Sequence, residues 1–192
     1  MKRFPLEQYA SLELNQVAFP KTGMVVSQVP LGADFTEAAP CENGMWVVAD
    51  KAAGVITPPS AQANAENLPI GIVYTAEKEY DMNHYGLKTF GRKIAGDYPR
   101  VGLLGIGDTV TTNCLQYDET VFVDAVGAKE HSALFAALED LKAHPLYVVP
   151  VAGSPVPDIV KAAPATGIYA KIVKFYTVPN GEKGVKYQVI RV

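Results

Sequence analysis

The chain is poor in the residues that build metal centres and disulfide frameworks. Its 192 residues include two cysteines, Cys41 and Cys114, which lie far apart in the sequence. A structural zinc site needs closely spaced donors, so these cysteines do not predict one. Two options remain, a disulfide between them or two separate buried thiols. The thiols are favoured for a protein made in a reducing cytoplasm.

Charged residues are also scarce, at 19% of the chain, and the formal net charge is −3. Proteins that bind nucleic acids carry a basic patch or stripe, and here the lysines and arginines are mostly scattered singly. The sequence therefore predicts no nucleic-acid partner. The low charge content instead favours a surface that is partly covered by something other than water. No apolar run approaches the roughly 20 residues of a membrane-spanning helix, so we expect a soluble protein.

The sequence shows no grouping of reactive side chains that is typical of an enzyme. The histidines, His84, His131 and His144, stand apart from one another. Gly153-Ser154-Pro155 lacks the pattern of a nucleophile elbow. The glycines between 102 and 107 lack the third glycine of a dinucleotide-binding fingerprint, and a strand-like run follows them where a helix is needed. We expect a protein that is not an enzyme and has no cofactor and no metal.

A polar stretch between residues 76 and 99 leaves two alternatives open. Three acidic residues alternate between 77 and 81, and in a strand they would share one face. Oxygen donors at this density could hold a calcium ion, but the spacing and turn glycine of a calcium loop are missing, so a solvated face is favoured. Tyr80, Tyr85 and Tyr98 in the same stretch suit the rim of a protein interface.

What the sequence does contain is a series of short apolar runs separated by turn residues. Met45–Ala49 follows the turn-forming pair Asn43-Gly44, and Leu68–Thr75 is a second clear run. Near the end of the chain, Ala170–Val178 and Val185–Val192 flank a turn with two glycines, which predicts a hairpin. This pattern indicates a mainly β fold, a small antiparallel β-barrel or sandwich.

One segment departs from the β pattern. Lys129–Ala143 carries large apolar residues at the spacing of one helical face, contains several alanines, and is followed by Pro145. The sequence therefore predicts one helix here. We expect it to lie in an insertion near residues 125–157.

The first 43 residues predict an extended N-terminal arm that precedes a β-rich body at 44–192. Their apolar side chains show no sustained period, and four prolines interrupt them. Such a segment either lies on a neighbouring subunit or wraps irregularly around its own domain, and the first interpretation is favoured. The residues expected to contact a partner, here and in the polar stretch, are Phe4, Leu12, Leu14, Val17, Phe19, Met24, Tyr80 and Tyr85.

Three stretches of the body follow one another in a recognisable order. Gly44–Asp50 is strand-like, Gly54–Pro58 follows a turn containing Asp and Gly, and Pro69–Val73 reads Pro-Ile-Gly-Ile-Val. In this order the stretches resemble the capsid decoration, or cement, proteins of tailed bacteriophages. The closing stretch, Lys174–Val189, is similar to the endings of phage structural proteins.

This resemblance implies a mechanical function on the virion. Decoration proteins are made in the host cytoplasm, bind the outer face of the assembled capsid, often as trimers, and clamp neighbouring subunits of the major capsid protein. The expected partners are therefore the major capsid protein and further copies of this chain, without nucleic acid or membrane. Two alternatives stay open: another phage structural subunit, such as a tail or head-completion component, and a carbohydrate-binding β module.

Overall fold

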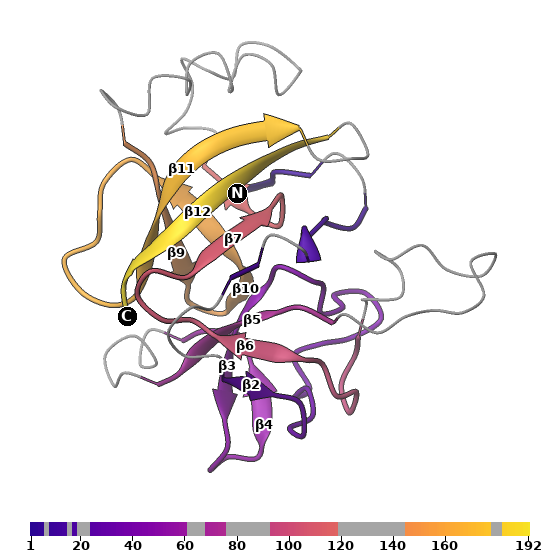
Figure 1. The fold of residues 1–192 in the computed structure, drawn as a ribbon. Helices are drawn as coiled ribbons and strands as arrows, with labels where there is room; N and C mark the ends of the chain where they lie inside the picture. Colours follow the sequence, from indigo (N-terminus) through magenta and orange to yellow (C-terminus); the bar gives the residue numbers. More distant parts are fainter. Residues whose placement is uncertain are drawn as a thin grey trace.

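Two curled β-sheets, each forming a half-barrel, lie against each other in this chain (Figure 1). The structure is a computed structural model, and it describes residues 1–5, 8–14, 17–18, 24–60, 68–75, 93–118, 145–177 and 182–192. The prediction of a mainly β fold is confirmed. The predicted helix at Lys129–Ala143 lies outside the described residues.

The larger sheet has seven strands in the order β1-β8-β10-β9-β11-β12-β7. These strands are β1 (Lys2–Arg3), β7 (Thr109–Thr112), β8 (Gln116–Tyr117), β9 (Tyr147–Val151), β10 (Ser154–Val160), β11 (Tyr169–Thr177) and β12 (Lys183–Arg191). Its neighbours are antiparallel except β8 and β10, which run parallel. The predicted C-terminal hairpin is confirmed as β11 and β12.

The smaller sheet has five strands in the order β2-β6-β5-β3-β4, all antiparallel. Its strands are β2 (Val25–Val26), β3 (Trp46–Asp50), β4 (Val55–Thr57), β5 (Ile70–Val73) and β6 (Val101–Leu103). It occupies the lower half of Figure 1, below the larger sheet.

Strand β3 explains why this part of the sequence is apolar on every residue from 45 to 49. Successive side chains of a strand point to opposite faces. Trp46 and Val48 enter the core between the two sheets, whereas Val47 and Ala49 enter a second core on the other face of the smaller sheet. A strand that is buried on both faces needs a continuous apolar run instead of an alternating one.

Gly71 allows strands β5 and β6 to approach closely. A Cβ atom at this position would lie 2.4 Å from the Cγ1 atom of Val101 and 2.8 Å from the carbonyl oxygen of Gly102. Both distances are shorter than side chains tolerate, so the glycine of the Pro-Ile-Gly-Ile-Val stretch is required by packing.

The structure does not confirm an N-terminal arm that is separate from the body. Strand β1 pairs with β8 at one edge of the seven-stranded sheet. At the other edge, the backbone N–H groups of Glu13 and Ala18 donate to the carbonyl oxygens of Thr111 and Thr109 in β7, at 3.0 and 2.9 Å. The same N-terminal segment is therefore hydrogen-bonded to both edges of one sheet.

Residues 27–45, which follow β2, cover the outer face of the smaller sheet. Val26, Leu31, Phe35 and Cys41 are buried in the second core, together with residues of β3 and β5. The described residues of 1–43 thus wrap around their own domain, which corrects the favoured interpretation. Their apolar side chains show no sustained period because some enter the core between the sheets and others enter the second core.

The expected insertion near residues 125–157 also needs correction in its described part, residues 145–157. These residues belong to β9 and β10, which pair with each other and with β8 and β11 inside the larger sheet. Pro155 and Pro157 lie where the register between β9 and β10 shifts, between Ser154 and Asp158. Proline has no backbone N–H to donate to a neighbouring strand. A strand therefore tolerates proline at an irregularity of this kind.

Candidate functional site

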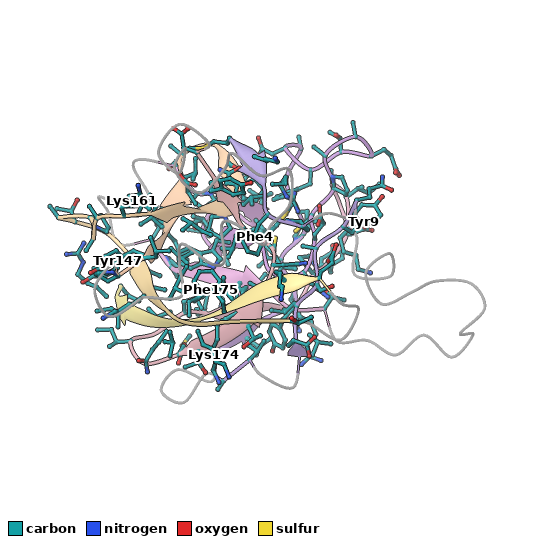
Figure 2. All side chains as sticks on the ribbon, turned by 90° about the horizontal axis from the view of Figure 1, so that it is seen from above. Phe4, Tyr9, Tyr147, Lys161, Lys174 and Phe175 are labelled. Carbon is teal, nitrogen blue, oxygen red and sulfur yellow. The ribbon has the colours of Figure 1, made fainter. Side chains whose placement is uncertain are left out.

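Among the described residues, those expected to contact a partner do not form one surface. Phe4 is completely buried and lies in the interior in Figure 2, and Leu12 is 6% exposed in the same core. Leu14 and Val17 are partly buried against that core. Met24, by contrast, is 51% exposed. The remaining three expected residues, Phe19, Tyr80 and Tyr85, lie outside the described residues.

Met24 marks an apolar, open sheet edge. It precedes β2, the terminal strand of the smaller sheet, and its carbonyl oxygen accepts a hydrogen bond of 3.0 Å from the backbone N–H of Leu103. Within β2, Val26 points into the core, whereas Val25 is 40% exposed. Among the described residues, no strand pairs with the outer side of β2. An edge strand with exposed apolar side chains is a template for association with another chain.

The two cysteines are placed in the second core as buried free thiols. Burial raises the pKa of the Cys114 thiol to about 12 and raises that of Cys41 well above its ordinary value. Because the thiolate is the reactive form, both groups are unreactive at neutral pH. His84, His131 and His144, the acidic residues between 77 and 81, and Tyr80 and Tyr85 lie outside the described residues.

Within the described ranges, no three histidine, cysteine or carboxylate side chains come together as a metal site would require. None of the helices found in that part of the chain is long and apolar enough to cross a membrane.

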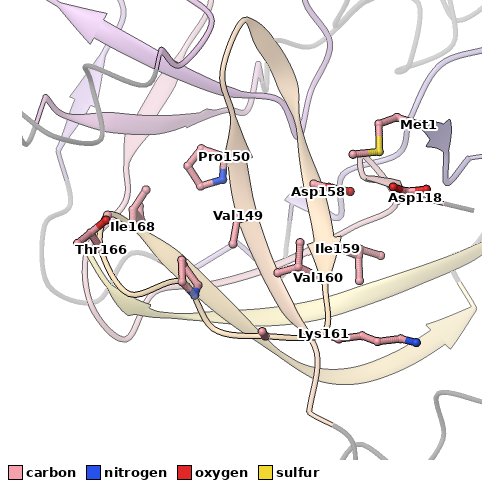
Figure 3. A pocket seen from close by; sticks show the side chains of 13 residues that line it. Met1, Asp118, Val149, Pro150, Asp158, Ile159, Val160, Lys161, Thr166 and Ile168 are labelled. Carbon is pink, nitrogen blue, oxygen red and sulfur yellow. The ribbon is translucent and has the colours of Figure 1, made fainter. Parts of the chain in front are cut away.

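A cavity of about 520 Å³ lies beside β9 and β10 (Figure 3). Its lining includes the apolar side chains of Val149, Pro150 and Ile168, with the carboxyl groups of Asp118 and Asp158 near one another. The loop that forms one wall is held by Arg191, whose guanidinium group donates to the carbonyl oxygens of residues 164, 165 and 167 at 2.8 to 3.1 Å. The cavity therefore has an apolar wall, an acidic end and a fixed rim.

Asp158 is the unusual member of this cavity. It is 6% exposed, and its Oδ1 atom has no hydrogen-bond partner among the described residues. The pKa of its carboxyl group is raised to about 6, because burial and the nearby Asp118 raise it more than a backbone hydrogen bond from Ile159 and the α-amino group of Met1 lower it. The sequence analysis did not select Asp158. A signal was present, because Asp158 is the one acidic residue in the apolar, proline-containing run 154–160.

Asp158 should make the stability of the protein depend on pH. Its pKa in the folded state lies above the ordinary value of 3.8, so the folded state binds more protons than the unfolded state between the two values. The free energy of unfolding should therefore fall as pH rises from about 4 to about 6, by about 1–3 kcal/mol from this group. The Asp158→Asn variant should lack this fall.

Urea denaturation of both proteins at several pH values measures the difference. At neutral pH we expect the Asp158→Asn variant to be the more stable protein, and at the acidic end the two should converge. An Asp34→Asn variant removes the same charge from an exposed position and serves as the control. A stability difference between wild type and Asp158→Asn that does not change with pH would contradict the prediction.

Comparison of the chain with protein-family models, with curated proteins and with solved structures gives no match in any of the three.

Proposed function

We propose that the protein is a capsid decoration subunit of a tailed bacteriophage that binds the outer face of the assembled shell and stabilises it. The three resembling stretches, 44–50, 54–58 and 69–73, contain strands β3, β4 and β5, which are neighbours in the order β4-β3-β5. The resemblance therefore falls on one continuous unit of the fold, and this supports the proposal.

The proposed mode of binding to the capsid rests on the apolar edge of the smaller sheet at β2. Met24 and Val25 are exposed there, and Ile106, in the turn after β6, is also exposed. Strand edges bind partners through added backbone hydrogen bonds, and the burial of exposed apolar side chains stabilises the complex. We assign Met24 and Val25 to the contact with the major capsid protein.

Shell stabilisation follows from selective binding. A subunit that contacts at least two capsid proteins at once binds the assembled lattice better than the free capsid protein, and a ligand that binds only the assembled state stabilises it. Association of this chain with its own copies, as a trimer, is part of the same proposal, because several linked contacts raise the overall affinity.

The test is to mix purified protein with expanded shells that lack it and to sediment the mixture. We expect the protein to sediment with the shells and to remain bound as salt is raised, because an apolar interface has few charge pairs that salt could screen. A Met24→Glu/Val25→Glu double variant should bind at least about tenfold more weakly, since it places charge in a desolvated contact.

Val173→Glu is the matched control. Val173 is 54% exposed on β11, which belongs to the other sheet. This variant should bind as the wild type does. The proposal is wrong if the wild-type protein stays in the supernatant at every salt concentration. Equal binding to unassembled capsid protein would count in favour of a tail component.

A further inference from the structure

Three lysines gather on the outer face of the β11–β12 hairpin. The inner face of the hairpin, which includes Ile172 and Tyr187, is buried in the core between the sheets. Lys171 and Lys174 are exposed and Lys186 is partly exposed, so all three lie on the opposite, outer face. Lys174 is seen at the outside of the body in Figure 2. We call these three residues the lysine face.

The pairing of the two strands holds these lysines close to one another. Lys174 lies directly opposite Lys186, and Lys171 lies opposite Gln188, two residues further along β12. Directly opposite residues of antiparallel strands have Cα atoms about 4.5–5.5 Å apart, and diagonal neighbours lie about 7–8 Å apart. The three positive charges are therefore confined to one short stretch of the hairpin.

The described residues provide no counter-charge for the lysine face. None of its three ammonium groups forms an ion pair or a hydrogen bond with them. The other residues paired with Lys171 and Lys186 are Tyr147, Gln188 and Thr111, which are uncharged. Like charges directly opposite each other destabilise a sheet, and sequences that break such a rule without compensation in the fold usually do so at functional sites. The lysine face therefore indicates a partner that supplies negative charge.

The shape of the sheet and the charge of the whole chain indicate the kind of partner. The larger sheet is a half-barrel with the core on its inner side, so the lysine face is convex and suits a ligand that contacts several lysines at once. The formal net charge is −3, so the chain without these three lysines carries −6. A long polyanion such as a nucleic acid would extend beyond the lysine face and be repelled by this remainder, whereas a short acidic segment would not.

We propose that the lysine face binds a short acidic segment of another protein through carboxylate side chains. In an extended segment, side chains two residues apart lie on the same side, about 6.5 Å from each other. The position of Lys171 and the position of the Lys174–Lys186 pair are also two residues apart along β12, so alternate carboxylates reach both. The lysine face belongs to the other sheet from β2, and the inference goes beyond the proposed function without depending on it.

The probe is a fluorescein-labelled peptide with blocked ends and alternating glutamate and serine, Glu-Ser-Glu-Ser-Glu-Ser-Glu, and its fluorescence anisotropy reports binding. At neutral pH and low salt we expect saturable binding. The affinity should fall at least about tenfold when sodium chloride is raised from about 20 mM to about 500 mM, because salt screens ion pairs at an exposed surface. The same peptide with glutamine in place of each glutamate should not bind. A single-stranded oligothymidylate of about 30 nucleotides should bind more weakly than the acidic peptide.

Lys174→Glu separates binding from folding. It replaces the repulsion with Lys186 by an attraction, so the unfolding temperature should rise while the affinity for the peptide falls at least about tenfold. Lys174→Gln removes the repulsion without adding a negative charge, and it should weaken binding at least about threefold without lowering the unfolding temperature. Lys51→Glu makes the same charge change as Lys174→Glu at an exposed turn of the smaller sheet, and it should bind as the wild type does.

Four results would overturn the proposal. They are no saturable binding of the acidic peptide, unchanged affinity in Lys174→Glu, an equal loss of affinity in Lys51→Glu, and tighter binding of oligothymidylate, which would identify a nucleic acid as the partner. Loss of binding in both Lys174 variants together with a lower unfolding temperature in both would assign the lysine a structural role, and this result also contradicts the proposal.

Discussion

Removal of residues 1–18 should unfold the protein. This segment supplies β1 at one edge of the larger sheet and the backbone partners of β7 at the other edge. It also supplies Phe4 and Leu12, which are buried in the core between the sheets. Truncating a buried phenylalanine to alanine costs about 3–5 kcal/mol, and a buried leucine about 2–5 kcal/mol. These losses are comparable with the whole stability of a typical domain, about 5–15 kcal/mol.

Polar contacts add to this effect. Arg3 forms an ion pair of 3.1 Å with Glu42, and the Glu42 carboxylate accepts a hydrogen bond of 2.9 Å from the backbone N–H of Ala10. The backbone N–H of Ser11 donates to the Oδ1 atom of Asn113 at 2.6 Å. Deleting the segment would leave Glu42 and Asn113, both buried, without these partners, which carries a desolvation cost.

Far-ultraviolet circular dichroism and urea denaturation of the truncated protein measure the effect. We expect loss of the cooperative transition. In full-length protein, Phe4→Ala should lower the free energy of unfolding by about 3–5 kcal/mol, whereas Met24→Ala, at an exposed position, should change it by less than about 0.5 kcal/mol. A truncated protein that unfolds cooperatively at the same urea concentration would show that the segment is only peripheral.

The sequence predicted the strands whose partners lie close by in the chain. The β11–β12 hairpin and the run at β3 carry their own signals, namely turn residues and uniform apolar character, and both were found. The fold of residues 1–43 could not be predicted in this way. Phe4 pairs with Leu115 and Leu12 with Thr112, about a hundred residues away, so nothing local in the sequence records these contacts.

The Asp158 cavity was missed for a related reason. Pro155 and Pro157 made residues 154–160 resemble an irregular exit from an insertion, because proline is depleted from strands. The register shift between β9 and β10 accommodates both prolines, and it brings Asp158 into the sheet opposite Gln116 and Val149. Burial and the shifted pKa of Asp158 depend on this packing, which the sequence pattern alone does not reveal.

Substitution of Trp46 by alanine should be among the most destabilising single changes in the chain. Trp46 in β3 and Tyr187 in β12 belong to different sheets and are both completely buried. The indole N–H of Trp46 donates to the Tyr187 hydroxyl oxygen at 2.8 Å, and the rings pack edge to face with centroids 5.9 Å apart. Trp46→Ala removes this bridge and leaves a cavity, so we expect a loss of about 3–5 kcal/mol.

Tyr187→Phe isolates the hydrogen bond from the packing. It keeps the ring and removes the acceptor, so the buried indole N–H loses its partner, at a cost of about 1–3 kcal/mol. Trp46→Phe removes the donor, and the double variant Trp46→Phe/Tyr187→Phe removes both groups. If the bridge couples the sheets, the double variant should be more stable than the sum of the two single losses predicts.

Urea denaturation of the four proteins measures this coupling, with Tyr98→Phe as the control because Tyr98 is 57% exposed. The control should match the wild type within about 0.5 kcal/mol. Additive losses in the double variant, or a Tyr187→Phe protein as stable as the wild type, would mean that the two sheets are held together by apolar packing alone. The expected non-additivity instead identifies the Trp46–Tyr187 hydrogen bond as a specific link between the two half-barrels. If the two side chains interact, each substitution costs less in a protein that already lacks the other group than it does in the wild type.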